Sequence, residues 1–405
     1  MKSYNSFIFD SCTFDPETGE IHLVYSLDDD VQFTEVLEIP TEGIRLNAIE
    51  QALFTLHIAG GASYYKTCCP KQIEVRSGIL NKDQAAFWNM VYENGLGEFF
   101  FENQIDFTGL IHFPINELET PVFHQSDRPS NGKVLVPIGG GKDSTVTIEK
   151  LRAEGRNITL LRMGGHPLID DLVSVTGLPC ITVKRKLPRK LFEMNEQGAL
   201  NGHIPITAYL SCLAVVVAEA IGFDEIIMSN EKSANEGNVE YLGKQINHQW
   251  SKSEEFETAF DGYIKKYINE NLKYFSKLRS FTELEIAGEF AKLPHYFACT
   301  TSCNKNWKVA GEHLQERWCG TCPKCTFVFA LMAAHLKRDT VEKIFEKNIF
   351  EDSSTIPLYK QLLGLEGFKP FECVGTPEET TQAFEMIKER GEFNDTPVMQ
   401  MYRDR

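Results

Sequence analysis

The side chains most able to do chemistry are concentrated in one glycine-rich segment. An apolar run, Val134–Ile138, is followed at once by Gly139, Gly140, Gly141, Lys142, Asp143 and Ser144. A strand, a glycine turn and a helix N-terminus together bind oxyanions, because backbone N–H groups converge there and the helix dipole favours negative charge. The alternative is a plain glycine turn. The segment favours a phosphate site instead, since Asp143 and Ser144 add ligands for Mg²⁺ and phosphate at the helix start.

Two common nucleotide-binding motifs do not fit this segment. A Walker A loop needs Gly-Lys-Ser/Thr with another glycine before it, but Asp143 follows Lys142. The dinucleotide motif Gly-x-Gly-x-x-Gly needs a third glycine where the chain has Ser144. The segment instead resembles the Ser/Gly-Gly-Gly-x-Asp-Ser loop of the ATP pyrophosphatases, the PP-loop family. These enzymes cut ATP between the α and β phosphates and transfer AMP to a substrate oxygen.

Four cysteines form a second candidate site. Two residues separate Cys319 from Cys322, and two separate Cys322 from Cys325. Fifteen residues lie between Cys303 and Cys319. Four thiolates at this spacing predict a tetrahedral zinc site with a structural role. The alternatives are an iron–sulfur cluster, a redox pair or buried free thiols. The arrangement also looks like the zinc site of 7-cyano-7-deazaguanine synthase, another PP-loop enzyme.

Polar side chains gather after the strand predicted at 225–229. Asn230 and Glu231 follow that strand directly, and Asn247, His248 and Lys252 lie a short distance on. So many donors around one tryptophan are unusual for a solvated loop. Ligands of an open parallel sheet bind beyond the carboxyl ends of its strands. We therefore expect these residues to face the same crevice as the glycine loop.

Two further groups have an open interpretation. His203, in Asn-Gly-His-Ile-Pro ahead of a long apolar helix, is expected either to contact ligand or to cap the helix. The basic cluster Lys184-Arg185-Lys186, with Arg189 and Lys190, is either a patch that steers phosphate or an ordinary exposed charge run.

The composition limits the class of protein. The chain has 405 residues and a formal net charge of −16, which argues against a nucleic-acid-binding surface. Its hydrophobic share of 42% is that of a globular protein. No apolar run is long enough to span a membrane, and the first residues lack a signal core. We predict a cytoplasmic protein in which the eleven cysteines are free, metal-bound or catalytic.

The expected organisation is α/β with three parts. Residues 1–125 contain a hairpin with an acidic turn at 28–30 and amphipathic helices at 46–56 and 85–92, so they predict an α+β domain. Residues 125–132 resemble a linker. Residues 133–255 alternate strands and helices, which predicts a parallel sheet with the PP-loop. Residues 256–405 are expected to be helical around the cysteine cluster.

The motifs taken together resemble one narrower family. Gly-Gly-Gly-Lys-Asp-Ser, Asn-Gly-His-Ile-Pro at 201–205, Ser-Asn-Glu at 229–231, Asn-His-Gln-Trp-Ser-Lys-Ser at 247–253 and Trp-Cys-Gly-Thr-Cys-Pro-Lys-Cys at 318–325 resemble the UDP-N-acetyl-α-D-muramoyl-L-alanyl-L-glutamate epimerases. The resemblance implies ATP-dependent conversion of the terminal L-Glu of a peptidoglycan precursor to D-Glu, giving AMP and pyrophosphate. It implies a UDP-muramoyl dipeptide as substrate and no nucleic-acid or membrane partner.

The resemblance also implies roles for individual residues. The Gly139–Gly141 amides and Ser144 would hold pyrophosphate, Asp143 would hold Mg²⁺, and Lys142 would neutralise phosphate charge. The turn at Met163 and Gly164 would accept adenine or ribose. Asn230, Glu231, Asn247 and His203 would contact substrate. His248 or Lys252 would be the base for epimerisation, with Cys299 as a rival.

Two other functional classes remain at this stage. One is a PP-loop enzyme that modifies a nucleobase, such as a deazaguanine nitrile synthase or a tRNA thiolase. The other is a nucleotide sensor without catalysis. Formation of AMP and pyrophosphate distinguishes an enzyme from a sensor, and dependence on the muramoyl dipeptide distinguishes the two enzymes.

Overall fold

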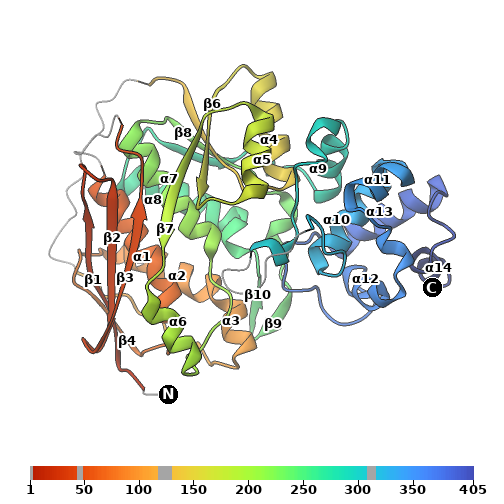
Figure 1. The fold of residues 1–405 in the computed structure, drawn as a ribbon. Coiled ribbons are helices and arrows are strands. Elements are labelled where there is room, and N and C mark those ends of the chain that lie inside the picture. The colour runs from red at the N-terminus through yellow and green to blue at the C-terminus, as the bar shows by residue number, and fades with distance from the viewer. Residues whose placement is uncertain (1–2, 43–48, 117–129, 308–315) are drawn as a thin grey trace.

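A computed structural model describes residues 3–42, 49–116, 130–307 and 316–405 (Figure 1). Strands and helices are mixed in the first two thirds of the chain, and the last third is helical. One nine-stranded sheet dominates, with the order β11-β8-β5-β6-β7-β3-β2-β1-β4. Its strands are β1 Ser6–Phe14, β2 Glu20–Leu27, β3 Val31–Glu38, β4 Gln72–Val75, β5 Lys133–Pro137, β6 Asn157–Met163, β7 Cys180–Lys186, β8 Glu225–Met228 and β11 Lys273–Ser276.

The half of the sheet that carries the glycine loop is parallel. β5 pairs in parallel with β6 and β8, β6 with β7, and β8 with β11. The crossover helices are α4 Lys142–Ala153, α5 Pro167–Thr176, α6 Arg189–Glu196, α7 Ile206–Ile221 and α8 Glu254–Tyr267. Their order confirms the alternation of strands and helices predicted from the sequence. Every carboxyl end of these strands consequently lies at one edge of the sheet.

The strands of the N-terminal part extend the same sheet. β1, β2 and β3 are antiparallel, and β3 pairs with β7 through Val36, Leu37 and Glu38 opposite Lys186, Arg185 and Lys184. The predicted hairpin is present, with Leu27 opposite Val31. The boundary predicted at residues 125–133 therefore runs through a continuous sheet. Most of the predicted linker, and Leu46 at the start of a predicted helix, lie outside the described residues.

The buried carboxylate of Glu35 helps to join β3 to β7. Glu35 is fully buried, and its carboxylate accepts hydrogen bonds from Arg185 at 2.7 Å, from Tyr64 at 2.5 Å and from Tyr209. Lys184 pairs with Glu38 at 2.7 Å. Two residues of the predicted basic cluster thus form ion pairs with acidic residues of β3. Neither residue is among those that line the cavity described below.

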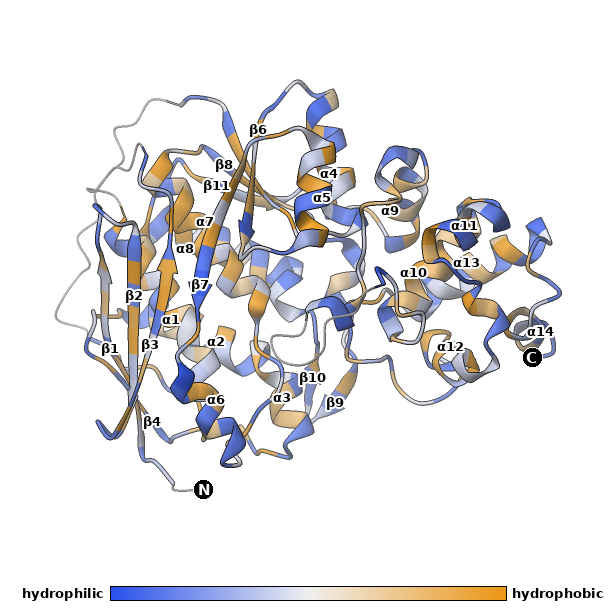
Figure 2. Ribbon diagram, in the orientation of Figure 1, coloured by the Kyte–Doolittle hydropathy of each residue, from blue (hydrophilic) through white to orange (hydrophobic). Residues whose placement is uncertain are grey.

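The described N-terminal residues form three helices, of which the first packs on β1 and β2 of this sheet. They are α1 Glu50–Tyr65, α2 Lys82–Gly95 and α3 Gly97–Glu102. A small two-stranded sheet, β9 Val239–Tyr241 and β10 Lys244–Ile246, follows β8. Figure 2 shows hydrophobic residues along the large sheet and along α7 and α10. Hydrophobic side chains from α1, α7 and the antiparallel strands share one buried core.

The C-terminal part is a cluster of helices at one end of the molecule (Figure 1). Its helices are α9 Glu283–Phe290, α10 Pro323–His335, α11 Arg338–Phe345, α12 Ile356–Leu362, α13 Pro377–Arg390 and α14 Pro397–Arg403. The prediction that residues after 255 are helical needs one correction. Strand β11 lies there and pairs with β8, because Tyr274 and Ser276 are buried against the sheet. Among the described residues, no helix is both long and apolar enough to cross a membrane.

Candidate active site

A cavity of about 500 Å³ opens at the carboxyl ends of β5, β6 and β8. The glycine loop, the end of β6 and the end of β8 contribute to its wall, as the sequence predicted for a parallel sheet. The C-terminal part adds a further wall. The polar and charged side chains around the cavity are those of Asp143, Ser144, Arg162, Thr207, Ser229, Asn230, Glu231, Lys252, Thr301, Ser302, Lys324 and Cys373.

The glycine loop has the backbone of an oxyanion site. Gly141 is the N-cap of α4 in an extended conformation, so the N–H groups of the first turn have no helical partners. Gly140 has φ +89°, which favours glycine, and a Cβ there would lie 3.2 Å from the Trp307 ring. A Cβ on Gly141 would lie 2.9 Å from Ser302 Oγ. The segment around residues 301–307 therefore covers the loop closely enough to require glycine.

The predicted phosphate ligands do not all face the cavity. Gly139, Gly141, Asp143 and Ser144 line it. Lys142 is instead buried, and its ammonium pairs with Asp143 and with Glu283 of α9. Burial opposes the charged form, yet these two carboxylates hold the Lys142 pKa above its ordinary value. This position assigns Lys142 to a buried ion cluster rather than to the cavity wall.

The end of β8 offers polar atoms without partners. Ser229 Oγ and Asn230 Nδ2 are buried, line the cavity, and have no hydrogen-bond partner among the described residues. Buried polar atoms are normally satisfied, so such exceptions mark a place for a ligand or water. Glu231 lies beside them. Burial raises the pKa of its carboxyl to about 7, although Lys252 opposes this shift.

Lys252 contacts a residue that sequence reasoning missed. Its ammonium lies 3.2 Å from the sulfur of Cys373, which precedes α13 and also lines the cavity. Burial alone would raise the pKa of the Cys373 thiol, but Lys252 and a hydrogen bond from His248 lower the pKa to about 5. The sulfur is thus held as a thiolate at neutral pH. Cys373 stands alone in the sequence, so no spacing pattern indicated it.

His248 lies behind Cys373 rather than in the cavity wall. Its Nδ1 pairs with the Glu98 carboxylate, and its backbone N–H donates to Asn238 Oδ1 at 2.9 Å. Burial disfavours its charge, but hydrogen bonds to Cys373 and Glu98 raise the His248 pKa to about 10. The result is a Glu98–His248–Cys373 series in which an acid orients a histidine that faces a sulfur.

His203 completes this group. Its ring lies 4.5 Å from that of His248, and its Nδ1 is 3.6 Å from Glu98. Burial lowers its pKa, and the charges of His248, Lys66 and Lys252 lower it further. We interpret the group as a hydrogen-bonded support for Cys373.

Other predicted residues have structural partners. The Asn247 amide donates to Ala234 O at 2.8 Å and accepts from the Gln249 N–H at 2.8 Å, so it fixes the loop. Met163 lines the cavity. Gly164 has φ +73° and donates to Val183 O at 2.7 Å. Cys299, the predicted rival base, lies outside the cavity wall, and burial raises its pKa.

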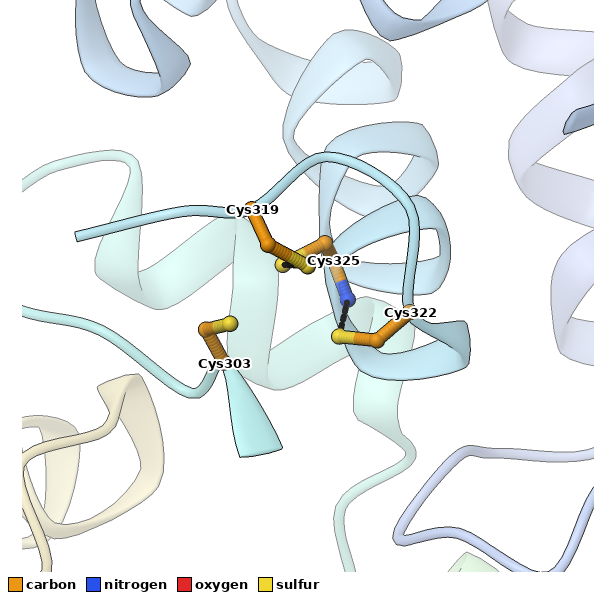
Figure 3. Close-up of side chains that lie close together, drawn as sticks. All are labelled: Cys303, Cys319, Cys322 and Cys325. Atoms are coloured by element: carbon orange, nitrogen blue, oxygen red, sulfur yellow. Dashed lines mark hydrogen bonds between the residues drawn. The ribbon is translucent and has the colours of Figure 1, made fainter. Parts of the chain in front are cut away.

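The four predicted zinc ligands converge at the start of α10 (Figure 3). The sulfurs of Cys303, Cys319, Cys322 and Cys325 all lie within 4.8 Å of one another, and those of Cys319 and Cys325 are 3.7 Å apart. The Cys325 N–H donates to Cys322 Sγ at 3.4 Å, a bond suited to a thiolate. Four sulfurs in one cluster fit zinc better than isolated buried thiols.

Comparisons with known proteins cover almost the whole chain. The MurL N-terminal domain model matches residues 1–277, and the MurL C-terminal domain model matches residues 299–405. A protein of Xanthomonas oryzae pv. oryzae named UDP-N-acetyl-alpha-D-muramoyl-L-alanyl-L-glutamate epimerase is 38% identical over 98% of this chain and 89% of its own. Proteins of the same name from Salinispora tropica and a Micromonospora species are 36% and 35% identical. The former match covers 98% of this chain and 88% of the relative, and the latter covers 100% and 91%.

The similarity to solved structures is weaker. A predicted subunit of a tRNA methyltransferase from Methanocaldococcus jannaschii shares 15% identity at a TM-score of 0.26, over 38% of this chain and 71% of that one. A score this low assigns neither fold nor function. The family models and the full-length relatives agree, and they confirm the family that the sequence motifs predicted. The chain therefore belongs to the MurL family of UDP-N-acetyl-α-D-muramoyl-L-alanyl-L-glutamate epimerases.

Proposed function

We propose that this protein epimerises the terminal L-Glu of UDP-MurNAc-L-Ala-L-Glu to D-Glu at the expense of ATP, releasing AMP and pyrophosphate. The epimerase activity is supported by the names of relatives that match it over nearly its whole length. The use of ATP is supported by one observation above all. The glycine loop, Asp143 and Ser144 line the same cavity as Asn230, Glu231 and Lys252.

The chemistry gives ATP a clear purpose. The Cα–H of a carboxylate is hard to remove, because the resulting anion would carry a second negative charge. Transfer of AMP to the carboxylate neutralises that charge, so the carbanion can delocalise as an enolate. Water then releases AMP from the epimerised product. This route needs a phosphate site and a base beside one substrate carboxylate, which matches the two walls of the cavity.

Residues of the loop support the transfer of AMP. The N–H groups at the start of α4 and the Ser144 hydroxyl are suited to hold pyrophosphate oxygens. The Asp143 carboxylate faces the cavity and would hold Mg²⁺, which supplies charge neutralisation at the phosphates. Lys142 holds Asp143 in place from behind. We further propose that the four-cysteine cluster carries one structural zinc ion. Dependence on ATP is consistent with the cytoplasmic location expected from the sequence.

A chiral analysis tests this proposal directly. Purified protein is incubated with ATP, Mg²⁺ and UDP-MurNAc-L-Ala-L-Glu, and D-Glu, AMP and pyrophosphate are measured together. We expect all three products in equal amounts, and no AMP without the dipeptide. Carboxy-deazaguanine should not replace the dipeptide, which distinguishes the nucleobase-modifying class. Epimerisation without ATP would overturn the proposed mechanism.

A further inference from the structure

Cys373 lines the same cavity as the glycine loop. The cavity that contains Asp143 and Ser144 also contains Cys373, Lys252 and Glu231. Asn230, only 5% exposed, lines the same cavity, and its buried amide nitrogen has no hydrogen-bond partner among the described residues. The cysteine therefore faces a site with independent signs of a ligand.

The neighbours of Cys373 suit a base better than a buried structural thiol. Lys252 Nζ is 3.2 Å from the sulfur, and the Lys324 ammonium donates to the Cys373 carbonyl. His248 also hydrogen-bonds the sulfur and is itself held by Glu98. Two cationic groups thus face the sulfur, and a fixed backbone restrains it. Such surroundings stabilise a thiolate at a residue that lines the cavity.

We propose that the Cys373 sulfur, held by Lys252 and by the Glu98–His248 pair, is the base that removes the Cα proton of the adenylated glutamate. This inference rests on the proposed function. The thiolate takes the proton and becomes a thiol, and the C–H electron pair moves into the enolate of the acyl phosphate. The Glu231 carboxyl, across Lys252 in the same cavity, delivers a proton to the opposite face and becomes a carboxylate. Proton exchange with solvent then restores both groups.

Solvent deuterium separates this step from the use of ATP. In D₂O, the wild-type protein should place deuterium at Cα of the product. Cys373→Ser should slow that exchange roughly 10²–10⁴-fold, the usual contribution of a general base, while still forming AMP when the dipeptide is present. Cys180→Ser, at the amino end of β7, is the matched control and should behave as wild type. Undiminished exchange in Cys373→Ser would overturn the inference, and so would loss of AMP formation along with exchange.

Alkylation of the unmutated protein provides a second test, which does not depend on the folding of a variant. The rate of iodoacetamide modification at Cys373, followed by peptide mass spectrometry, should reach half its maximum near the pKa of about 5. Cys180, whose pKa is raised by burial, should react only at alkaline pH. The titratable groups around the Cys373 sulfur are those of Lys252, His248, Lys324, Lys369 and Glu372. Lys252→Met should move the Cys373 midpoint upward by about one pH unit or more, the shift expected on loss of a close opposite charge.

Further measurements distinguish Cys373 as a base from Cys373 as a nucleophile, and separate both from a failure of the proposed use of ATP. Protein modified only at Cys373 should form AMP without deuterium exchange, and an unchanged exchange rate would overturn the inference. A glutamyl thioester on Cys373 in acid-quenched wild-type protein would also overturn it, because the sulfur would then be a nucleophile. Epimerisation without AMP formation would overturn the proposed use of ATP but not the role of Cys373. The deuterium exchange rate of Cys373→Ser would still show whether Cys373 is the base.

Discussion

The buried ion cluster beneath the glycine loop gives a quantitative test of the role assigned to Lys142. The Lys142 ammonium contacts Asp143 and Glu283, and Lys324 lies 3.4 Å from the same Glu283 carboxylate. Lys142→Met keeps the volume of the side chain but leaves two carboxylates with fewer cations. Breaking a buried pair in this way typically costs about 3–5 kcal/mol. Because Lys324 still neutralises part of the charge, we expect the lower end, about 3 kcal/mol in the free energy of unfolding.

A double-mutant cycle in urea measures the interaction. Glu283→Gln removes the acid, and the two changes together should be less harmful than the sum of the single changes by roughly 1–3 kcal/mol, as for residues in one ion network. Lys82→Met, on the exposed start of α2, is the control and should stay within about 0.5 kcal/mol of wild type. If the effects of Lys142→Met and Glu283→Gln on the free energy of unfolding were additive, the two residues would not interact. If Lys142→Met had normal stability but could not bind ATP, the result would support the phosphate-neutralising role that the sequence predicted for Lys142.

The same cluster predicts the direction of a pH effect. Burial would raise the Glu283 pKa, but Lys142 and Lys324 outweigh burial and keep it below its ordinary value of 4.5. A carboxyl whose pKa is lower in the folded state stabilises the fold above its unfolded pKa. That stabilisation is lost as the pH falls through the folded value. We therefore expect the wild-type protein to lose stability below about pH 4.5, and Lys142→Met to lose less over the same range.

Three further predictions concern the site. Asp143→Asn and Ser144→Ala should each slow AMP formation roughly 10²–10³-fold, the cost of losing one contact that stabilises charge in the transition state. Near-normal AMP release in both variants would refute the phosphate site. Gly140→Ala should slow AMP formation and destabilise the protein by about 1 kcal/mol, because φ is positive there; an unchanged rate would show that Trp307 can move aside. Cys303→Ser should remove about one equivalent of zinc, measured by elemental analysis, and wild-type protein without zinc would refute the metal site.

The position of the glycine loop was predictable because its residues are consecutive. Gly139 to Ser144 follow one strand and begin one helix, so local sequence alone fixes their mutual positions. The four cysteines were predictable for a similar reason, as three of them lie within one turn at the start of α10. The parallel strands were found through their alternation with helices. Their common edge then followed from the rule for open sheets.

Other features depend on contacts that span most of the chain. β4 and β11 have four residues each, too short to show a periodic pattern. Arg185 looked like part of an exposed charge run, but the partner that buries it is Glu35, 150 positions away. The pairing of Lys142 with Glu283, 141 positions away, could not be predicted from the sequence either. Such pairings are decided by packing between elements rather than by local preference.

The proposed base illustrates this limit most clearly, because its neighbours come from distant parts of the chain. Glu98 comes from α3, His248 and Lys252 follow β10, and Cys373 precedes α13. Lys324, which donates to the Cys373 carbonyl, lies between the proposed zinc ligands Cys322 and Cys325. A metal at that cluster would fix the start of α10 and, through Lys324, the backbone of the proposed base. Loss of the metal should consequently slow deuterium exchange at Cα more than it slows formation of AMP, because the glycine loop is built on β5 and α4.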